Sequence, residues 1–458
     1  STPLHVPLDG VYVETFWFAV PCRILWPNWT KMHGEQDDPS DSIDFTVPQI
    51  ASGAGGFSHN GLADHMGLPP AIDIGTVSAL PFRAYNKIYN DWFRDQNLID
   101  SADVQTGDSG DLIANYPIQK RGKRHDYFTT CLPSPQKGAA VQLPLGTAAP
   151  VVPTSATAGG PTFFVNDSDP TSYELRYEGG VGGIGLNPNP AGSGHLDWDD
   201  TKLEADLSTA TSVTLNEFRE SVLFQQILER SARGGTRYVE LIRSFWGVNS
   251  PDFRMQRSEF IGGGTQNVVY NPVAATTQLT KVVGDLGAFG TSYGEGHRFV
   301  KSFDEHCIVL GLISMRADLS YQQGIHRDWR KESRYHFYLP DLAHLGEQAV
   351  LSEEIWADGS ANDQDVFGYQ ERWAELRYGN SEDVSLFRSS NPASLDAWHL
   401  AQDFATRPVL GQTFIEEDPP FDRINAVSGQ PHFWFQAYTN VRHARAMPVR
   451  SVPGIHRL

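Results

Sequence analysis

The sequence predicts a mainly β protein, a sandwich or barrel whose strands are separated by long loops. Its 458 residues include 42 glycines and 29 prolines, and 11% of the residues are aromatic whereas only 20% are charged. Glycine and proline favour turns, and aromatic side chains favour the pleated surface of a sheet. Strands and helices do not alternate in the regular way that a parallel α/β sheet requires. Together these observations favour an antiparallel β fold.

The most prominent single element is an aromatic amphipathic helix within Val77–Asn97. Pro81 fits the first turn of a helix, where a missing N–H costs no hydrogen bond. Polar residues, among them Arg83, form one face of this helix. We expect a helix from Pro81 to Asn97 that buries its other face against a sheet. The residues of that face recur at spacings of three and four; they are Phe82, Tyr85, Ile88, Tyr89, Trp92 and Phe93.

Short runs of β-branched and aromatic residues between turn signals predict the strands. The clearest is Val11–Val20, which ends at Pro21, and Cys307–Met315 is apolar enough to be a strand buried on both faces. The regions between predicted strands include Gly34–Gly75 and Val282–Gly290, which lack periodicity and are expected to be loops and turns. Further strands are predicted at Asp126–Leu132, Arg298–Phe303, Arg334–Leu339 and Phe433–Tyr438.

The interval Gly146–Asp200 differs in composition from the rest of the chain. It is dominated by small and polar residues with a few apolar bursts, so we expect a surface insertion rather than core. A linker without fixed structure is the alternative. A second surface excursion is predicted at Asp341–Asp365. The aromatic candidates for pairing in hairpins, for packing a protrusion or for contact at its tip are Phe163, Phe164, Tyr173 and Tyr177.

A helical hairpin is predicted within residues 211–247. The run from Thr214 to Glu217 has a capping-box pattern, and the helical stripe that follows ends at Gly234-Gly235. A second helical stripe covers Thr236–Trp246 and stops at Gly247. We expect residues 1–458 to form a single domain that carries residues 146–200 as a surface insertion, which the family resemblance given below implies is variable, and residues 211–247 as a helical hairpin.

The charge distribution is acidic overall and basic in two places. The net charge of −19 argues against a protein whose main task is to coat DNA by neutralising phosphates. The densest basic run is Lys120–His125, which is either a phosphate or partner contact or a solvated turn. The segment Val441–Leu458 has no carboxylate side chain, so it is expected to contact phosphate or a neighbour's acidic surface, a solvated tail being the alternative. Its candidate contact residues are Arg442, Arg445, Arg450 and Arg457.

Targeting and redox signals are weak. No apolar run reaches the length of about 18 residues that a membrane-spanning helix needs, so no membrane span is predicted. The first residues, STPLHVPLDG, lack the basic and apolar regions of a signal peptide, and residues upstream of Ser1 are either removed or lie outside this sequence. The three cysteines, Cys22, Cys131 and Cys307, form neither a disulfide framework nor a zinc motif, which favours free thiols.

No arrangement of residues demands catalysis, and no cofactor is predicted. The tetrad Gly107-Asp108-Ser109-Gly110 is similar to a protease nucleophile loop, but Asp111 follows it where the motif has glycine. Gly262-Gly263-Gly264 lacks the Gly-Lys-Ser/Thr of a P-loop. Calcium at a subunit contact remains an open alternative without a supporting spacing. Acidic pairs are expected to be solvated in loops; they are Asp199-Asp200, Glu353-Glu354 and Glu416-Glu417.

Several segments, in order along the chain, resemble the major capsid protein of the Microviridae, the small circular single-stranded DNA phages that include the gokushoviruses. The resemblance covers most of the chain, and the combination of segments is specific. The segments are LPFRAYNKIYNDWFRDQN (80–97), CLPSPQKG (131–138), Glu229–Gly264, VFGYQERWAELRY (366–378), SLDAWHLAQDF (394–404) and ARAMPVRSVPGI (444–455).

This resemblance implies an eight-stranded viral jelly roll with long insertions between strands and a few helices. It implies a structural protein, not an enzyme, whose copies assemble into a T=1 icosahedral shell around a circular single-stranded DNA genome. The implied partners are other copies of the chain, the genome, a small basic DNA-packaging protein, a pilot or minor capsid protein and a host surface receptor. The 146–200 insertion would project near the threefold axes and attach to the host. Assembly would take place in the cytoplasm of a bacterial host, and the product would be the virion.

A different class of protein also fits the composition. A secreted β-sandwich that binds or cleaves glycans would use its tryptophans for stacking on sugars. In a glycan-cleaving version, two carboxylates about 5 to 9.5 Å apart would carry the chemistry. A megadalton particle favours the shell, whereas a stable monomer with affinity for glycans favours this alternative.

Overall fold

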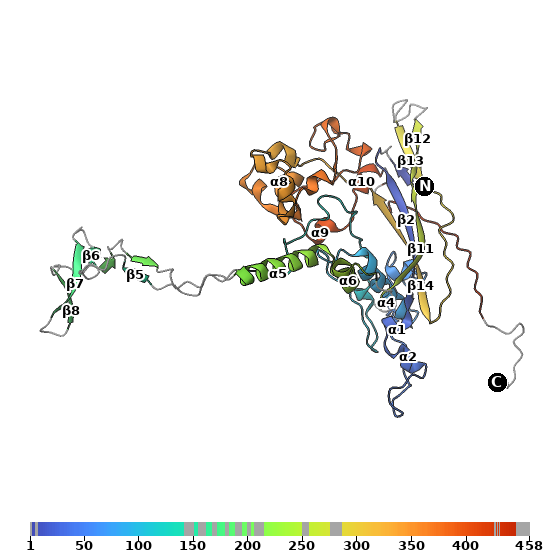
Figure 1. Cartoon of the computed structure of the whole chain (residues 1–458). Coiled ribbons are helices and arrows are strands. Elements are labelled where there is room, and N and C mark those ends of the chain that lie inside the picture. The colour runs from blue at the N-terminus through green and yellow to red at the C-terminus, as the bar shows by residue number, and fades with distance from the viewer. Residues whose placement is uncertain are drawn as a thin grey trace, which may run out of the picture. The chain divides into compact units, whose positions relative to one another are not determined.

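The computed structural model describes residues 8–141, 215–249, 256–274 and 286–445 except 426, 428 and 430, together with the backbone of short strands elsewhere. The chain divides into two compact units (Figure 1). The larger comprises residues 1–135 and 231–458, and the smaller comprises residues 136–230. The described residues form mostly short strands with a few helices, as the predicted mainly β class requires, and the sheets are small and almost all antiparallel.

A three-stranded antiparallel sheet forms the centre of the larger unit, in the order β11–β2–β14. Strand β2 (Val11–Pro21) lies in the middle and pairs along its length with β11 (Glu259–Asn267) and with β14 (Cys307–Ala317). The predicted strands at Val11–Val20 and Cys307–Met315 are thereby confirmed. β14 lies at an edge and is half-exposed over most of its length, so the expectation that it is buried on both faces is wrong.

Helix α4 (Leu80–Ile88) packs against one face of this sheet, as the aromatic stripe predicts (Figure 1). It continues as one π-helical turn, η1 (Tyr89–Phe93), and ends there because Arg94 has an extended backbone, so the helix is shorter than the expected end at Asn97. The core between helix and sheet is built from Phe18, Val20, Leu25, Trp26, Leu80, Ala84 and Ile88, with Ile308, Leu310 and Leu312 partly buried against it.

Two residues of α4–η1 differ from the sequence expectation. Arg83, assigned to the polar face, is fully buried. Its burial is possible because its guanidinium group forms an ion pair with the carboxylate of Asp111 on a neighbouring loop. Trp92, assigned to the buried face, is 39% exposed. It lies at the margin of the core, where its Nε1 donates to the Ser258 carbonyl at 3.0 Å and the Arg257 guanidinium stacks 4.2 Å from the ring centroid.

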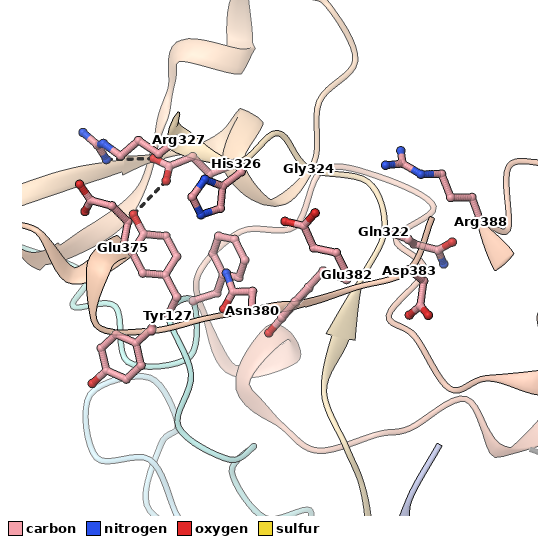
Figure 2. A pocket seen from close by; sticks show the side chains of 14 residues that line it. Tyr127, Gln322, Gly324, His326, Arg327, Glu375, Asn380, Glu382, Asp383 and Arg388 are labelled. Atoms are coloured by element: carbon pink, nitrogen blue, oxygen red, sulfur yellow. Dashed lines mark hydrogen bonds and ion pairs between the residues drawn. The ribbon is translucent and has the colours of Figure 1, made fainter. Parts of the chain in front are cut away.

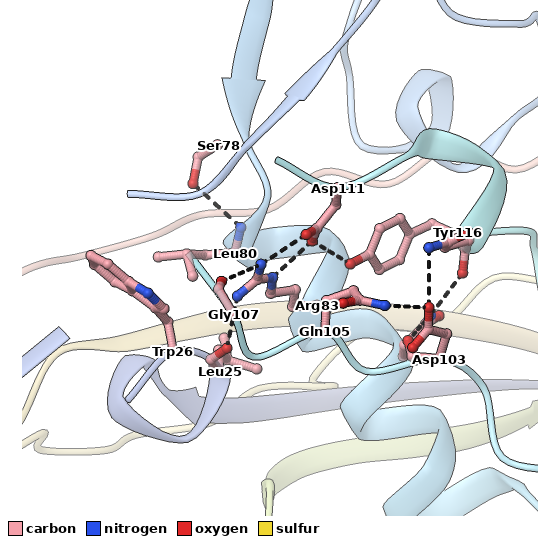
Figure 3. A network of polar contacts seen from close by, with 12 residues as sticks. Leu25, Trp26, Ser78, Leu80, Arg83, Asp103, Gln105, Gly107, Asp111 and Tyr116 are labelled. Atoms are coloured by element: carbon pink, nitrogen blue, oxygen red, sulfur yellow. Dashed lines mark hydrogen bonds and ion pairs between the residues drawn. The ribbon is translucent and has the colours of Figure 1, made fainter. Parts of the chain in front are cut away.

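The buried Arg83 holds the loop Ser101–Asp111 against the helix (Figure 3). Its Nε and Nη2 donate to the Asp111 carboxylate at 2.7 and 2.8 Å, and Nη2 also donates to the Gly107 carbonyl at 2.9 Å. The Tyr116 hydroxyl donates to the same carboxylate at 2.6 Å. Burial alone would lower the pKa of Arg83, but the hydrogen bonds and charge of Asp111 outweigh it and raise that pKa.

A second core holds the C-terminal half of the larger unit together. It contains Tyr127, Phe128, Tyr321, Val350, Ile355, Phe367 and Phe414. Strand β16 (Glu347–Leu351) pairs with β17 (Val366–Glu371), and helix α8 (Ser352–Ile355) between them is buried. The prediction of a surface excursion at Asp341–Asp365 is therefore wrong, because its central residues supply this core.

Other predicted strands are not formed. Asp126–Leu132 folds as turns with one isolated bridge to Tyr369, because Tyr127 and Phe128 point into the second core instead of pairing along an edge. Arg298–Phe303 and Phe433–Tyr438 have no regular structure, and Arg334–Leu339 contains a 3₁₀ turn. Conversely, the expected connection Val282–Gly290 overlaps strand β13 (Leu286–Thr291), which pairs with two strands.

The remaining elements of the larger unit are short. Strands β1 (Thr2–Leu4), β13 (Leu286–Thr291) and β12 (Val269–Ala274) form one antiparallel sheet. Two-stranded pairs are β3 (Gln49–Ala51) with β4 (Thr76–Ser78), and the parallel pair β15 (Ser320–Tyr321) with β18 (Ser381–Glu382). The α-helices are α1 (Cys22–Leu25), α2 (Asn28–Met32), α3 (Leu62–His65), α6 (Tyr238–Trp246), α9 (Gln412–Ile415) and α10 (Phe421–Ile424). The 3₁₀ turns are η2 (Ile113–Asn115), η4 (Arg327–Arg330), η5 (Arg334–His336), η6 (Pro340–His344), η7 (Ala361–Gln364), η8 (Ala374–Leu376), η9 (Ser385–Phe387) and η10 (Asp396–Trp398).

The smaller unit contains a four-stranded antiparallel sheet in the order β8–β7–β6–β9 and a separate pair of strands, β5 and β10. Most of helix α5 (Leu215–Arg233) belongs to it, and with α6 this gives the two helices expected within residues 211–247. The unit begins and ends at one place, where the Lys137 N–H donates to the Leu228 carbonyl at 3.3 Å. The strands are β5 (Val151–Pro153), β6 (Thr162–Asn166), β7 (Ser172–Glu178), β8 (Gly183–Asn187), β9 (His195–Trp198) and β10 (Leu203–Ala205).

Within the described residues the strands do not close into a barrel, since they fall into seven separate sheets. No helix there is long and apolar enough to cross a membrane.

Candidate assembly surface

The C-terminal arm, Pro431–Arg445, exposes several large apolar side chains. Near its start, the Phe433 ring packs edge-on against Phe421 with 4.8 Å between centroids. Beyond that point Trp434 is 70% exposed and Tyr438 is 91% exposed. Within the described residues, Trp434–Arg445 makes no hydrogen bond, ion pair or ring contact, and Figure 1 shows it as an extended trace. Large apolar side chains left in water in this way are typical of a surface that a partner covers.

The predicted basic contact residues lie on this arm or beyond it. Arg442 and Arg445 are exposed at the end of the arm. Arg450 and Arg457 lie outside the described residues. The two described guanidinium groups are therefore free to meet phosphate or a carboxylate on another molecule.

The predicted candidates in the insertion lie on two paired strands. Phe163 and Phe164 belong to β6, and Tyr173 and Tyr177 belong to β7. The backbone register places Phe163 opposite Tyr173, so these residues do occur in a hairpin. Their side chains lie outside the described part of the chain.

Two further apolar surfaces were not recognised in the sequence. Helix α5 exposes five large apolar side chains, which its helical pattern suggested would be packed; they are Phe218, Val222, Leu223, Phe224 and Ile227. The turns η4 and η5 and the residues after them expose Trp329, Tyr335, Phe337 and Tyr338. The same aromatic residues led to the predicted strand at Arg334–Leu339. A single sequence does not distinguish aromatic residues that lie exposed on a surface from aromatic residues of a strand that pack in a core.

The basic run Lys120–His125 is bound within its own chain. Arg121 and Arg124 both donate to the Glu14 carboxylate, at 2.6 and 3.2 Å. Arg124 also donates to Asp318 at 3.2 Å. Lys123 is buried above the Phe414 ring, and burial lowers its pKa to about 8. These residues are therefore structural, and the alternative of a phosphate contact is not supported for them.

One small cavity lined largely by polar residues lies in the C-terminal half of the larger unit (Figure 2). Tyr127 donates to Glu354 at 2.8 Å, and Arg327 donates to the same carboxylate at 3.0 Å. Burial raises the pKa of Glu354, and the Arg327 charge opposes this rise. The cavity volume is about 20 Å³, close to the size of a single water site, so the cluster fits a structural role.

The acidic pairs are less solvated than expected. Glu353 and Glu354 are buried and paired with Arg330 and Arg327, and Glu417 is buried against Arg316. Asp199-Asp200 lies outside the described residues. Asp108, from the tetrad similar to a protease loop, instead accepts hydrogen bonds from Trp26 and Asn28. No group of three or more potential metal ligands occurs in the described part of the chain.

All three thiols are free. Cys22 and Cys131 are buried, and Cys307 is half-exposed on β14. Burial raises the pKa of Cys22 and of Cys307 to about 11 and raises that of Cys131 further.

Comparison with known proteins identifies the family of this chain. The family model described as "Capsid protein (F protein)" matches residues 1–455. This chain belongs to that capsid protein family. The chain is 43% identical to capsid protein VP1 of Bdellovibrio phage phiMH2K, over 96% of this chain and 85% of the relative. It is 35% identical to capsid protein VP1 of Chlamydia phage 1, over 100% and 89% of the two chains. It is 36% identical to capsid protein VP1 of Spiroplasma virus 4, over 100% and 88%.

The resemblance to Microviridae capsid proteins is thus confirmed. The protein is a structural capsid protein of a phage virion and not an enzyme. The alternative of a secreted glycan-binding or glycan-cleaving protein is set aside, because the family match covers nearly the whole chain.

Proposed function

We propose that this protein is the major shell protein of a T=1 icosahedral particle, in which identical copies enclose a circular single-stranded DNA genome. The full-length match to the capsid protein family carries this proposal. The exposed apolar residues of the C-terminal arm support it, because a protein that stays monomeric in water does not usually leave such a segment uncovered. Closed point-group symmetry is the usual outcome when identical copies meet through fixed contacts.

The decisive experiment is to express the chain in a bacterial host and to determine the mass and shape of the product. We expect particles of megadalton mass, with an icosahedral image of one chain per symmetry position by cryo-electron microscopy. A stable monomer of 50.8 kDa under all assembly conditions would contradict the proposal. The same reconstruction tests the proposed eight-stranded jelly roll, to which the sheet β11–β2–β14 would contribute three strands.

The genome and its small basic packaging protein are proposed partners on the inner side of the shell. The support is the basic tail, with Arg442 and Arg445 exposed in a chain of net charge −19. Replacing Arg442, Arg445 and Arg450 by Gln should reduce packaged DNA or the heat resistance of particles, and the difference from the unsubstituted chain should be greatest at low salt, where charges are screened least. The matched control replaces the same three residues by Lys, which keeps the charge. Unchanged packaging and heat resistance in the Gln variant would leave the tail without a role in either contact.

The insertion at 146–200 is proposed to project near the threefold axes and to recognise a receptor on the host surface. Its strands β6–β9 form one sheet within the smaller unit, residues 136–230, and the hydrogen bond between Lys137 and Leu228 joins the two ends of that unit, which supports a self-contained projection. Replacing this interval by that of a relative should leave particles intact and redirect adsorption. Particles that still adsorb only to the original host would place recognition elsewhere. We further propose assembly in the host cytoplasm and incorporation of a pilot or minor capsid protein.

A further inference from the structure

Strand β14 is an unfinished edge of the central sheet. In its 11 residues, Cys307–Ala317, it pairs with β2 alone among the described strands. No hydrogen bond to the outward backbone groups of Ile308–Met315 is made by the described residues. A long apolar edge of this kind is a template for another strand, and proteins normally protect such edges when no partner exists.

The C-terminal arm has a sequence that favours a β-strand, but among the described residues it pairs with no other strand. Phe433–Tyr438, FWFQAY, has the composition of a strand, which is why a strand was predicted there. The structure leaves the segment extended, with Trp434, Phe435 and Tyr438 exposed. Beyond Phe433, the backbone groups of this segment make no hydrogen bond and its aromatic rings make no ring contact within the described chain.

The C-terminal arm and β14 match in length, and their charges match when the two segments run antiparallel. Phe433–His443 is as long as β14. In an antiparallel pairing the basic end of the arm, with Arg442, lies at the Cys307 end of β14. Asp304 lies just before that end and is exposed. Opposite charges at this end favour the antiparallel direction.

We infer that the segment Phe433–His443 of the C-terminal arm of one copy adds as a strand to the β14 edge of a neighbouring copy in the shell. Backbone hydrogen bonds supply the affinity, and the aromatic side chains of the arm cover the half-exposed face of β14. The arm begins in the same apolar cluster that holds Met315 and Ala317 of its own β14, yet it does not pair there. The isolated chain therefore keeps both surfaces open until a second copy arrives. This inference rests on the proposed shell.

Crosslinking to the native thiol Cys307 tests the pairing in assembled particles. His443→Cys places a thiol opposite Cys307 in the antiparallel register, and Val441→Cys brackets that register on the same side of the strand. A short bismaleimide is applied at pH 8 with a long incubation, because the pKa of Cys307 is raised. We expect bands at multiples of the 50.8 kDa chain on a denaturing gel, with the linked peptides identified by mass spectrometry.

Two controls make the crosslink specific. Gln436→Cys lies seven positions away along the arm, roughly 23 Å at the rise of a strand, and is expected to give no link. His443→Cys combined with Cys307→Ser should also give none. A link within one chain, a link from Gln436→Cys alone, or no link in intact particles would each overturn the exchange while the shell proposal stands. Failure of the unsubstituted chain to form any particle would overturn both.

A proline pair tests the backbone bonds without new thiols. Gln436→Pro with Ala437→Pro removes two successive N–H donors, one of which faces the neighbouring strand in either register. The control, Gln436→Ala with Ala437→Ser, keeps both donors. We expect the proline variant to fold, as checked by circular dichroism of the unassembled chain, and to lose at least tenfold in particle yield. Equal yield and heat resistance for the two variants would overturn the inference.

Discussion

At the scale of single residues, the fold depends on charges that are buried and fully paired. Arg83 and Asp111 have almost no exposed side-chain surface, and three hydrogen-bond partners besides the ion pair satisfy their remaining polar atoms. Neither charge is tolerable without the other, because an isolated ion in an apolar interior loses its hydration without compensation. The pair therefore fixes one position of the loop on helix α4.

Removing one member of this pair should be far more harmful than removing both. We expect Arg83→Met to lower the free energy of unfolding by about 3–5 kcal/mol, because Asp111 is left buried without its partner. Arg83→Met combined with Asp111→Leu should recover much of that loss. Urea unfolding of the unassembled chain measures the difference, and a double variant as unstable as the single one would contradict this account.

Lys123 predicts a pH dependence of stability. Its pKa is lowered to about 8 in the folded chain, whereas an unfolded lysine keeps a value near 10.4. Between these values the unfolded chain binds more protons, so this residue's contribution to unfolding free energy rises with pH. Below pH 8 the cost of burying the charge is fully present.

Lys123→Met isolates this contribution, because it removes the charge and keeps most of the apolar stem. The stability of the variant relative to the original chain should be greatest near pH 7 and should fall as pH approaches 10. Urea midpoints of both chains at several pH values measure the change. A difference that does not vary with pH would show that Lys123 is not buried as a cation.

At the scale of elements, helix α4 is held by its packing on the central sheet. Ile88 is fully buried in that contact, whereas Trp92 lies at its margin. We expect Ile88→Ala to cost about 2–5 kcal/mol, because it leaves a cavity in the core. Trp92→Phe should cost less, since phenylalanine keeps an aromatic ring at this partly exposed position and mainly the hydrogen bond to Ser258 and part of the ring contact are lost. The thermal unfolding midpoints of the two variants test which substitution is more destabilising. A larger loss for Trp92→Phe would indicate that the main packing contact lies at η1 rather than at Ile88.

The contact of β11 with β2 depends on a glycine. A Cβ at Gly263 would lie 2.2 Å from the Thr15 carbonyl oxygen, a backbone atom that cannot move aside without breaking the ladder. Gly263→Ala should therefore destabilise the sheet strongly. Gly287→Ala is the control, because its nearest atom lies 3.9 Å away. Soluble yield and circular dichroism of the two variants compare them, and equal behaviour would contradict the close approach.

The elements predicted correctly are those whose pattern is local. Strand β2 and helix α4 carry periodic apolar residues over many positions, and the pair α5 and α6 is bounded by glycines. Asp126–Leu132 and Arg334–Leu339 failed because a run of aromatic residues is compatible with a strand, a buried turn or an exposed contact. What decides among these is the position of a distant partner, which a single sequence does not contain.

The same limit applies to the candidate surfaces. The basic bias of Val441–Leu458 is visible without a structure, and Arg442 and Arg445 are indeed exposed. The apolar residues of α5 have the periodicity of a packed helix, so only the structure shows that they face water. Arg83 was misplaced for the converse reason: its partner Asp111 is 28 positions away in sequence.

At the scale of the whole molecule, the smaller unit is one continuous interval of the chain whose two ends are joined by a hydrogen bond. The hydrogen bond between Lys137 and Leu228 closes residues 136–230 into a loop, and the closure entropy of such a loop depends only weakly on its length. The core residues of the larger unit lie outside this interval.

Deleting residues 138–227 and joining the ends by a few glycines should therefore leave the larger unit folded. We expect its thermal unfolding midpoint to stay within a few degrees of that of the intact chain, with the same far-ultraviolet signature of the sheets. Loss of cooperative unfolding in the deletion variant would show that the insertion is part of the core after all.

The buried cysteines have a consequence for how the particle ages outside a cell. A thiol reacts with oxidants and disulfides as its thiolate, and pKa values near 11 or above leave almost none of that form at neutral pH. Cys22 and Cys131 are also shielded from solvent, so air or a foreign disulfide reaches only Cys307, and slowly. A coat built from this chain would therefore keep its thiols reduced during long storage in aerated water, without forming the random crosslinks that would prevent it from opening in the next host.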